Sequence, residues 1–217
     1  MRTFAGKFRS RLPVAAFFTV ISALALAQTP YRQPPAAEYL KILEDPHRID
    51  RLNPEAVVAK LGLRPGDVVA DIGSGSGLFT LIMAQAVTPG GRVYAVDIDK
   101  ELLAYVSAKA KESGIGNITP VLAPEDSPSL PPGSLDLALV CDTLHHIGKR
   151  QVYLKNLKAC MRPGGRIAII DFSTGWPAGH ESLRFSMAEL DTWTAAAGLK
   201  LTREFSDIEG NFFRVYQ

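Results

Sequence analysis

Short apolar runs alternate with mixed polar and apolar stretches between residues 68 and 197. Runs rich in Val, Ile and Leu predict buried parallel strands, which we place at residues 68–72, 92–97, 118–122, 135–141 and 166–171. The stretches that follow these runs predict helices at residues 78–87, 100–113, 149–160 and 187–197. Turn signals such as Pro89-Gly90-Gly91 separate the elements. This alternation predicts an α/β fold with a doubly wound, mostly parallel sheet.

The end of the chain follows a different pattern. Two strand-like segments, residues 199–205 and 211–216, are separated by only five residues. So short a connection joins antiparallel strands, because a parallel crossover needs about a dozen residues or more. We therefore expect an antiparallel C-terminal hairpin beside the parallel sheet.

The N-terminal segment differs in composition from the rest of the chain. Residues 1–12 carry four basic side chains and no acid, and residues 12–27 are nearly all apolar and end in Ala25-Leu26-Ala27. This pattern predicts a signal peptide cleaved after Ala27, or an N-terminal anchor, over residues 1–27. The apolar run is short for a membrane span. We expect a periplasmic or secreted protein, with a membrane-anchored or cytoplasmic location as the alternative.

Residues 28–52 predict a linker and a lid segment. Prolines favour an extended linker at the start of this stretch, followed by a short helix at residues 38–44 and a break at 45–48. The domain itself is expected to span residues 53–217. Asn53 is placed to cap its first helix, with Pro54 at the first helical position.

The charge balance changes once the leader is set aside. The whole chain has a formal charge of +2, and residues 1–27 hold four of its 24 basic side chains. The remainder has 20 basic and 22 acidic side chains, a formal charge of −2. Nothing basic is left to bind a phosphate backbone, so nucleic acid is not an expected partner. We expect a monomer or homodimer that meets a membrane only through an uncleaved leader.

Cysteine and histidine spacing predicts neither a disulfide nor a metal site. Cys141 and Cys160 are expected at opposite ends of a helix of about eight residues or more, which would hold the thiols over about 10 Å apart. We therefore expect both thiols to be free. The four histidines are scattered along the sequence and show no zinc-ligand spacing.

The glycine-rich turn after the first predicted strand carries the strongest chemical signal. Residues 68–77 read as a buried strand, a carboxylate at Asp71, and three glycines at alternate positions. Glycine lets a ligand lie against bare backbone, and a helix N-terminus favours anionic groups. The dinucleotide fingerprint needs a different glycine spacing. Asp71 would repel a pyrophosphate but could accept hydrogen bonds from an ammonium group. The turn therefore favours a nucleoside that bears an amino acid over NAD.

The second predicted strand ends in a carboxylate at Asp97, about twenty residues beyond the glycine turn, where it is placed to accept both ribose hydroxyls. Asp99 fits a helix cap better, because it precedes the helix at 100–113.

Together these motifs resemble those of the class I S-adenosylmethionine (SAM)-dependent methyltransferases. The Asp-x-Gly-x-Gly-x-Gly pattern at 71–77 resembles their motif I, and the strand ending at Asp97 resembles their motif II. The ending at 142–146 and the turn at 163–165 resemble those of the ubiquinone/menaquinone C-methyltransferase group. The likeness is strong over residues 53–172 and weak elsewhere. It implies SAM as the cofactor and a seven-stranded sheet in the order 3-2-1-4-5-7-6.

The resemblance carries cofactor roles onto particular residues. The amino-acid end of the cofactor is assigned to Asp71, Gly73, Ser74, Gly75 and Gly77, the ribose to Asp97, and the adenine to Ile98, Asp126 and, as second choice, Glu125. Related proteins use an Asp near the adenine, but ungapped alignment places Pro124 on that position. Cys141 and Asp142 are candidates beside the sulfonium.

Two adjacent histidines follow the fourth predicted strand. His146 and His145, in that order, are candidate catalytic bases, because neutral imidazole can remove a proton near pH 7. The alternative is that one caps the next helix and the other packs against the sheet.

Other residues could line the acceptor side of the site. Asp171 ends the fifth predicted strand, and Arg48 and Arg51 are candidate contacts for an acidic group of the substrate. The loop 173–186, with Trp176, His180 and Glu181, could form a wall. Each of these could equally be a strand end, a solvated helix residue or a surface loop.

We therefore predict a methyl transfer from SAM to a small-molecule acceptor. The alternatives are a SAM-binding protein without transferase activity and an aminopropyltransferase-like enzyme, which would use decarboxylated SAM. An NAD oxidoreductase is disfavoured by the glycine spacing and by the C-terminal hairpin.

Overall fold

The computed structural model describes Met1 and residues 33–217. Apart from Met1, the predicted leader at 1–27 and the first part of the linker lie outside the described residues. No helix within residues 33–217 is long and apolar enough to cross a membrane.

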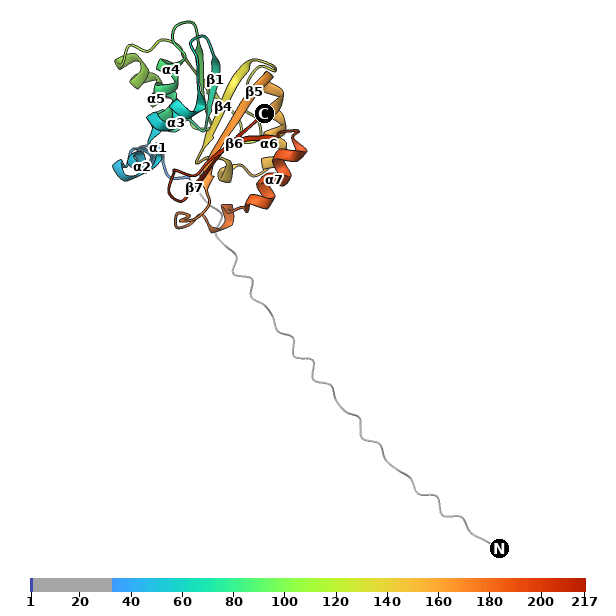
Figure 1. Cartoon of the computed structure of the whole chain (residues 1–217). Helices are drawn as coiled ribbons and strands as arrows, with labels where there is room; N and C mark the ends of the chain where they lie inside the picture. The colour runs from blue at the N-terminus through green and yellow to red at the C-terminus, as the bar shows by residue number, and fades with distance from the viewer. Residues whose placement is uncertain (2–32) are drawn as a thin grey trace.

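Seven strands form one sheet in the order β3-β2-β1-β4-β5-β7-β6, which confirms the expected order (Figure 1). The strands are β1 (Val68–Ile72), β2 (Arg92–Asp97), β3 (Ile118–Leu122), β4 (Leu135–Cys141), β5 (Met161–Phe172), β6 (Leu201–Phe205) and β7 (Asn211–Tyr216). The first five strands pair in parallel, whereas β7 runs antiparallel to both of its neighbours. The parallel strands therefore end at one edge of the sheet, where ligands bind in folds of this class.

Helices cover both faces of the sheet (Figure 1). They are α1 (Ala36–Leu43), α2 (Pro46–Leu52), α3 (Pro54–Leu61), α4 (Leu78–Ala86), α5 (Lys100–Glu112), α6 (Arg150–Cys160) and α7 (Met187–Ala196), with short 3-10 turns η1 (Leu144–His146) and η2 (Glu181–Leu183). The side chains of alternate residues in the central strand β4 lie on opposite faces of the sheet. Leu139 packs with α3 and α4, whereas Val140 packs with α6 and α7. Both side chains are fully buried, as expected for a central strand covered on both sides.

Local sequence signals explain where several helices begin. Asp99 accepts hydrogen bonds from the backbone N–H groups of Glu101 and Leu102, which confirms it as the cap of α5. Asn53 caps α3, with Pro54 in the first turn. These short polar side chains satisfy backbone donors that have no partner inside the helix.

Two local predictions are corrected by the structure. The first helix ends before Asp45, as expected, but residues 46–48 do not form a break: Asp45 caps a further helix, α2, by accepting hydrogen bonds from the backbone of His47 and Arg48. The proline permits this because its missing N–H is not needed at the first helical position. The second correction concerns β5, which begins at Met161 rather than at residue 166. The Pro-Gly-Gly turn lies within its span, at a shift of register against β4.

Candidate functional site

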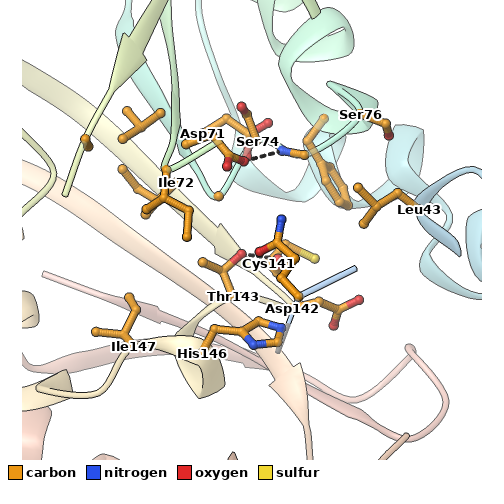
Figure 2. Close-up of a pocket in the computed structure, with 18 of the residues that line it drawn as sticks. Leu43, Asp71, Ile72, Ser74, Ser76, Cys141, Asp142, Thr143, His146 and Ile147 are labelled. Atoms are coloured by element: carbon orange, nitrogen blue, oxygen red, sulfur yellow. Dashed lines mark hydrogen bonds between the residues drawn. The ribbon is translucent and has the colours of Figure 1, made fainter. Parts of the chain in front are cut away.

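A cavity of about 940 Å³, including its solvent-open part, lies at the C-terminal ends of β1, β2 and β4 (Figure 2). Ten of the predicted site residues line it: Asp71, Gly73, Ser74, Gly75, Asp97, Ile98, Glu125, Cys141, Asp142 and His146. Three others, Gly77, Asp126 and His145, are not among its lining residues. Tyr39, Leu43 and Arg48 extend the lining from α1 and α2. The sheet edge therefore forms the base of the pocket, and the N-terminal helices contribute to its wall.

The glycine turn is held in place by backbone hydrogen bonds. The N–H groups of Gly73 and Ser74 both donate to the carbonyl oxygen of Val96, at 2.8 and 3.0 Å. Gly73 has a φ of +72°, and a Cβ there would lie 2.3 Å from the Thr143 hydroxyl. Glycine is therefore needed at this position both for the left-handed backbone and for the close approach of the segment after β4.

Ser74 presents a polar atom that the protein itself leaves unsatisfied. Its side chain is buried and lines the cavity, and its hydroxyl oxygen has no hydrogen-bond partner among the described residues. A buried hydroxyl without a partner is costly, and such groups are usually satisfied by water or by a ligand. The turn therefore has capacity for a polar ligand group.

Asp71 is buried beneath this turn, with only 2% of its surface exposed. Its carboxylate accepts a hydrogen bond of 2.6 Å from the Thr80 hydroxyl of α4. Burial raises the pKa of Asp71 to about 6, and the charge of Asp97 adds to the rise. The bond from Thr80 and the charge of Arg48 oppose it. A cation placed beside Asp71 would stabilise its charged form.

Asp97 closes β2 and organises the turn from the other side. Its two carboxylate oxygens accept hydrogen bonds from the backbone of Gly75, at 2.9 Å, and of Asp99, at 3.0 Å. Burial raises its pKa, and these bonds oppose the shift. A carboxylate oxygen can accept more than one hydrogen bond, so Asp97 keeps capacity for donors in the cavity.

Of the two neighbouring acids predicted on the adenine side, only Glu125 lines the cavity. Pro124 and Glu125 line the cavity beside Ile98, whereas Asp126 is exposed outside the lining. The backbone carbonyl of Asp126 accepts a hydrogen bond from Asn156 of α6. Of the two predicted acids, the arrangement favours Glu125 as the one within reach of a ligand.

Asp142 is held by side chains from distant parts of the chain. It accepts hydrogen bonds from Arg48, at 3.1 Å, and from the side-chain amide of Asn211, at 3.0 Å, and Arg51 lies 3.8 Å away. Its φ of +47° is uncommon for a residue other than glycine. The carboxylate therefore joins α2 and the start of β7 to the segment after β4. Both arginines, predicted as substrate contacts, make this intramolecular ion pair.

Sequence reasoning missed Asn211 because nothing local marks it. Thr143 was also missed, although it lines the cavity and its hydroxyl donates to the carbonyl of Cys141 at 2.8 Å. Both thiols, Cys141 and Cys160, are free and buried, as expected. Cys160 packs in the core, where its thiol donates to the backbone carbonyl of Leu130.

The paired histidines lie in η1, with different surroundings. His145 is buried, and its ring nitrogen Nδ1 lies 2.7 Å from a carboxylate oxygen of Asp171. His146 lines the cavity and faces it from the side opposite Ser74 (Figure 2). Desolvation lowers the pKa of His146 to about 3, and the charges of His145, His180 and Arg150 add to the shift. The imidazole is neutral near pH 7, but so low a pKa makes it a weak proton acceptor.

Asp171 does not line this cavity. Its side chain is fully buried and accepts hydrogen bonds from the backbone N–H groups of His145 and Phe172, in addition to the contact with the His145 ring. The loop after β5 brings His180 within 5.4 Å of both paired rings, measured between ring centroids. The expectation of scattered histidines is therefore corrected, because folding gathers three of the four.

The central part of the chain is similar in sequence to known proteins. A sequence profile described as a methyltransferase domain matches residues 70–169. The ubiquinone/menaquinone biosynthesis C-methyltransferase UbiE of Burkholderia multivorans is 30% identical over 120 residues, which are 55% of this chain and 49% of that protein. The chain thus spans about half the length of the curated relatives that it matches.

Two solved structures extend the comparison. A SAM-dependent methyltransferase from Aquifex aeolicus is 26% identical with a TM-score of 0.75, over 85% of this chain and 98% of that one. The 1,6-didemethyltoxoflavin-N1-methyltransferase of Burkholderia thailandensis, solved with 1,6-didemethyltoxoflavin and S-adenosylhomocysteine, is 22% identical with a TM-score of 0.60. That alignment covers 87% of this chain and 92% of the other, and it shows a shared fold.

Proposed function

Since this chain belongs to the class I SAM-dependent methyltransferases, we propose that it transfers the methyl group of SAM to a small-molecule acceptor. The proposal depends above all on one observation. Asp71, the unsatisfied hydroxyl of Ser74 and Asp97 line a single cavity at the carboxyl ends of adjacent parallel strands.

The charged and polar groups of the cavity suit those of this cofactor. Asp71 offers a buried carboxylate to the ammonium group, and Ser74 offers a hydroxyl to the amino-acid carboxylate. Asp97 has acceptor capacity for the ribose hydroxyls. Ile98, whose side chain is half exposed at the cavity, offers an apolar surface to the adenine, and Glu125 offers an acceptor to its amino group.

SAM supplies an activated methyl carbon, so the protein's task is to orient the acceptor and exclude water. An acceptor atom held in line at about 3 Å from the methyl carbon needs little further catalysis. The segment 141–146 borders the side of the cavity left for the acceptor, and the Arg48–Asp142 ion pair fixes α2 beside it. The weak basicity of His146 favours an acceptor that ionises readily or needs no base.

Titration calorimetry with S-adenosylhomocysteine tests the cofactor assignment. We expect one site per chain, and Asp97→Ala should weaken binding by about 10²- to 10⁴-fold, because two charge-assisted hydrogen bonds of about 1.5–3 kcal/mol each are at stake. A ligand at 100 times its dissociation constant should add about 2.7 kcal/mol of stability in a thermal-shift assay.

Glu101→Gln is the matched control, since it removes an exposed acid from α5, whose N-terminus follows Asp97 closely. It should bind like the unmodified chain. Absence of binding by the unmodified chain, or equal loss in both variants, would contradict the assignment. Transfer is assayed separately with methyl-labelled SAM and a panel of small phenols, quinols and amines, and binding without transfer to any acceptor would support a cofactor-binding role alone.

A further inference from the structure

Three of the four histidines form a cluster beside the cofactor cavity. His145 and His146 come from η1, and His180 immediately precedes η2. One potential ligand atom from each ring lies within 4.8 Å of the other two. His145 is buried, and the other two are half-buried. Imidazole nitrogens gathered in this way are the ligands that zinc and related divalent ions prefer.

Asp171 fixes the position of one of these rings. Its carboxylate lies 2.7 Å from Nδ1 of His145 and also accepts the backbone N–H of the same residue. A carboxylate on one ring nitrogen fixes the proton there, so the lone pair is on Nε2. Carboxylate–histidine pairs of this kind support metal ligands in many proteins. Asp171 is fully buried, and its charge offsets part of the charge of a nearby cation.

His180 has a comparable, weaker support. Its Nδ1 lies 3.3 Å from the backbone carbonyl oxygen of Ala178, which favours a proton on that nitrogen and a lone pair on the other. In two of the three rings, therefore, one nitrogen lies within hydrogen-bond distance of an oxygen acceptor of the protein.

We propose that His145, His146 and His180 form a binding site for a divalent transition-metal ion of the zinc class. Nitrogen ligands at about 2.0–2.1 Å from a tetrahedral ion lie about 3.3 Å apart. The most distant pair therefore has to approach by no more than about 1.5 Å. His180 belongs to an exposed loop that contains Gly175 and Gly179, both at positive φ, and that leads into η2. A small movement of this loop can supply that approach.

The surroundings of the cluster suit a bound ion on most sides. Phe172 and Trp176 pack their rings 5.5 and 5.6 Å from His145, measured between centroids, and they form an apolar shell. Arg150 is the nearby cation. Its guanidinium group donates hydrogen bonds to the backbone carbonyl oxygens of Leu144, His145 and Leu183.

The position of the cluster connects it to the proposed reaction. His146 belongs both to the cluster and to the lining of the cavity. An ion bound here takes the lone pair of His146 and so excludes it as a base. It offers in exchange an open coordination position at the border of the acceptor side, suited to an anionic oxygen of the acceptor. This last step rests on the proposed function, whereas metal binding itself does not.

The test is direct metal binding by the full chain without an affinity tag. Equilibrium dialysis with Zn²⁺, followed by elemental analysis, should give one ion per chain. Co²⁺ should give the visible absorption bands of a tetrahedral site. His180→Ala removes a ligand on an exposed loop, so the variant should fold, and its Zn²⁺ affinity should fall by at least the 10- to 100-fold typical of losing a supporting residue.

His47→Ala is the matched control, because it removes the exposed fourth histidine, on α2. Its Zn²⁺ affinity should equal that of the unmodified chain. No stoichiometric binding by the unmodified chain, or equal affinity in His180→Ala, would overturn the proposal. Binding of S-adenosylhomocysteine is measured on the same samples. Its retention in a chain that fails to bind Zn²⁺ would reject the metal site and leave the proposed function standing.

Discussion

At the scale of single residues, Asp71 and Asp142 are two acids of the pocket that are satisfied in different ways. Asp142 already has cationic partners in Arg48 and Arg51. Asp71 accepts hydrogen bonds from Thr80 and feels the charge of Arg48 from a greater distance, and its pKa is raised to about 6. An acid without a close cation inside a cavity is a place where ligand charge can be recognised. We therefore assign to Asp71 the electrostatic part of cofactor binding.

This assignment predicts the pH dependence of binding. A pKa of about 6 leaves about a tenth of Asp71 ionised at pH 5 and about nine tenths at pH 7. Because an ammonium group favours the ionised form, affinity for S-adenosylhomocysteine should rise about tenfold between these values. Calorimetry at pH 5, 6 and 7 measures this change in affinity. Asp71→Asn should bind more weakly with a flatter profile, and a parallel profile in that variant would contradict the assignment.

The same shift has the opposite effect on the free protein. The pKa of Asp71 is higher in the folded chain than its ordinary value of 3.8, so the folded state holds the proton more tightly. Its contribution to stability is present below about pH 4 and is lost as pH rises through about 6, by about 3 kcal/mol in total. Asp71→Asn should remove this dependence, and urea unfolding of both proteins across pH 4–7 would show whether it does.

Gly73 gives a third prediction at this scale. Alanine there would combine a φ of +72° with a Cβ 2.3 Å from a Thr143 hydroxyl that is itself hydrogen-bonded. We expect Gly73→Ala to cost about 2–4 kcal/mol of stability. Gly62→Ala is the control, because it has a φ of +62° but open space around the new atom, and it should cost about 1 kcal/mol. Equal urea midpoints for the two variants would show that the contact is relieved cheaply.

At the scale of elements, α2 is attached to the pocket by charge more than by apolar packing. Leu52 is its one fully buried side chain, and Arg48 and Arg51 form ion pairs with Asp142, which lines the cavity. Hydrogen bonds between charged groups contribute about 1.5–3 kcal/mol when partly buried. The position of this helix therefore depends strongly on one carboxylate from the segment after β4.

Arg48→Ala should loosen this attachment. We expect faster amide hydrogen exchange over residues 36–52 and a several-fold weaker affinity for S-adenosylhomocysteine, because α1 and α2 form part of the pocket wall. His47→Ala, on the exposed side of the same helix, should leave both unchanged. Exchange that rises only in the control, or in neither variant, would show that α2 is held by other contacts.

At the scale of the whole molecule, the C-terminal hairpin completes the sheet. β7 inserts between β5 and β6, and its Asn211 reaches back to Asp142 at the pocket. Phe213 of this strand is fully buried against the α3–α4 face, with the Phe205 ring 4.7 Å away between centroids. The last strand in the sequence thus supports both the core and the site.

Phe213→Ala tests the structural part of this role. Removing a buried aromatic side chain should cost about 3–5 kcal/mol. Leu201→Ala, on the neighbouring strand, removes a side chain that is 46% exposed, and it should cost less than about 1 kcal/mol. Chemical denaturation measures both variants. Similar costs would show that the hairpin contributes little to the folding unit.

The sequence by itself determined the α/β alternation, the hairpin, the free thiols, the caps at Asn53 and Asp99, and the placement of Asp71 and Asp97 at one edge of the sheet. These features depend on local patterns, and strand ends of a parallel sheet meet at one edge whatever the details. Only the tertiary structure decided the Arg48–Asp142–Asn211 network and the gathering of the three histidines. Arg48 lies 94 positions from Asp142, and Asn211 lies 69. Such contacts depend on the paths of whole loops and on the packing of distant elements, which no local pattern specifies.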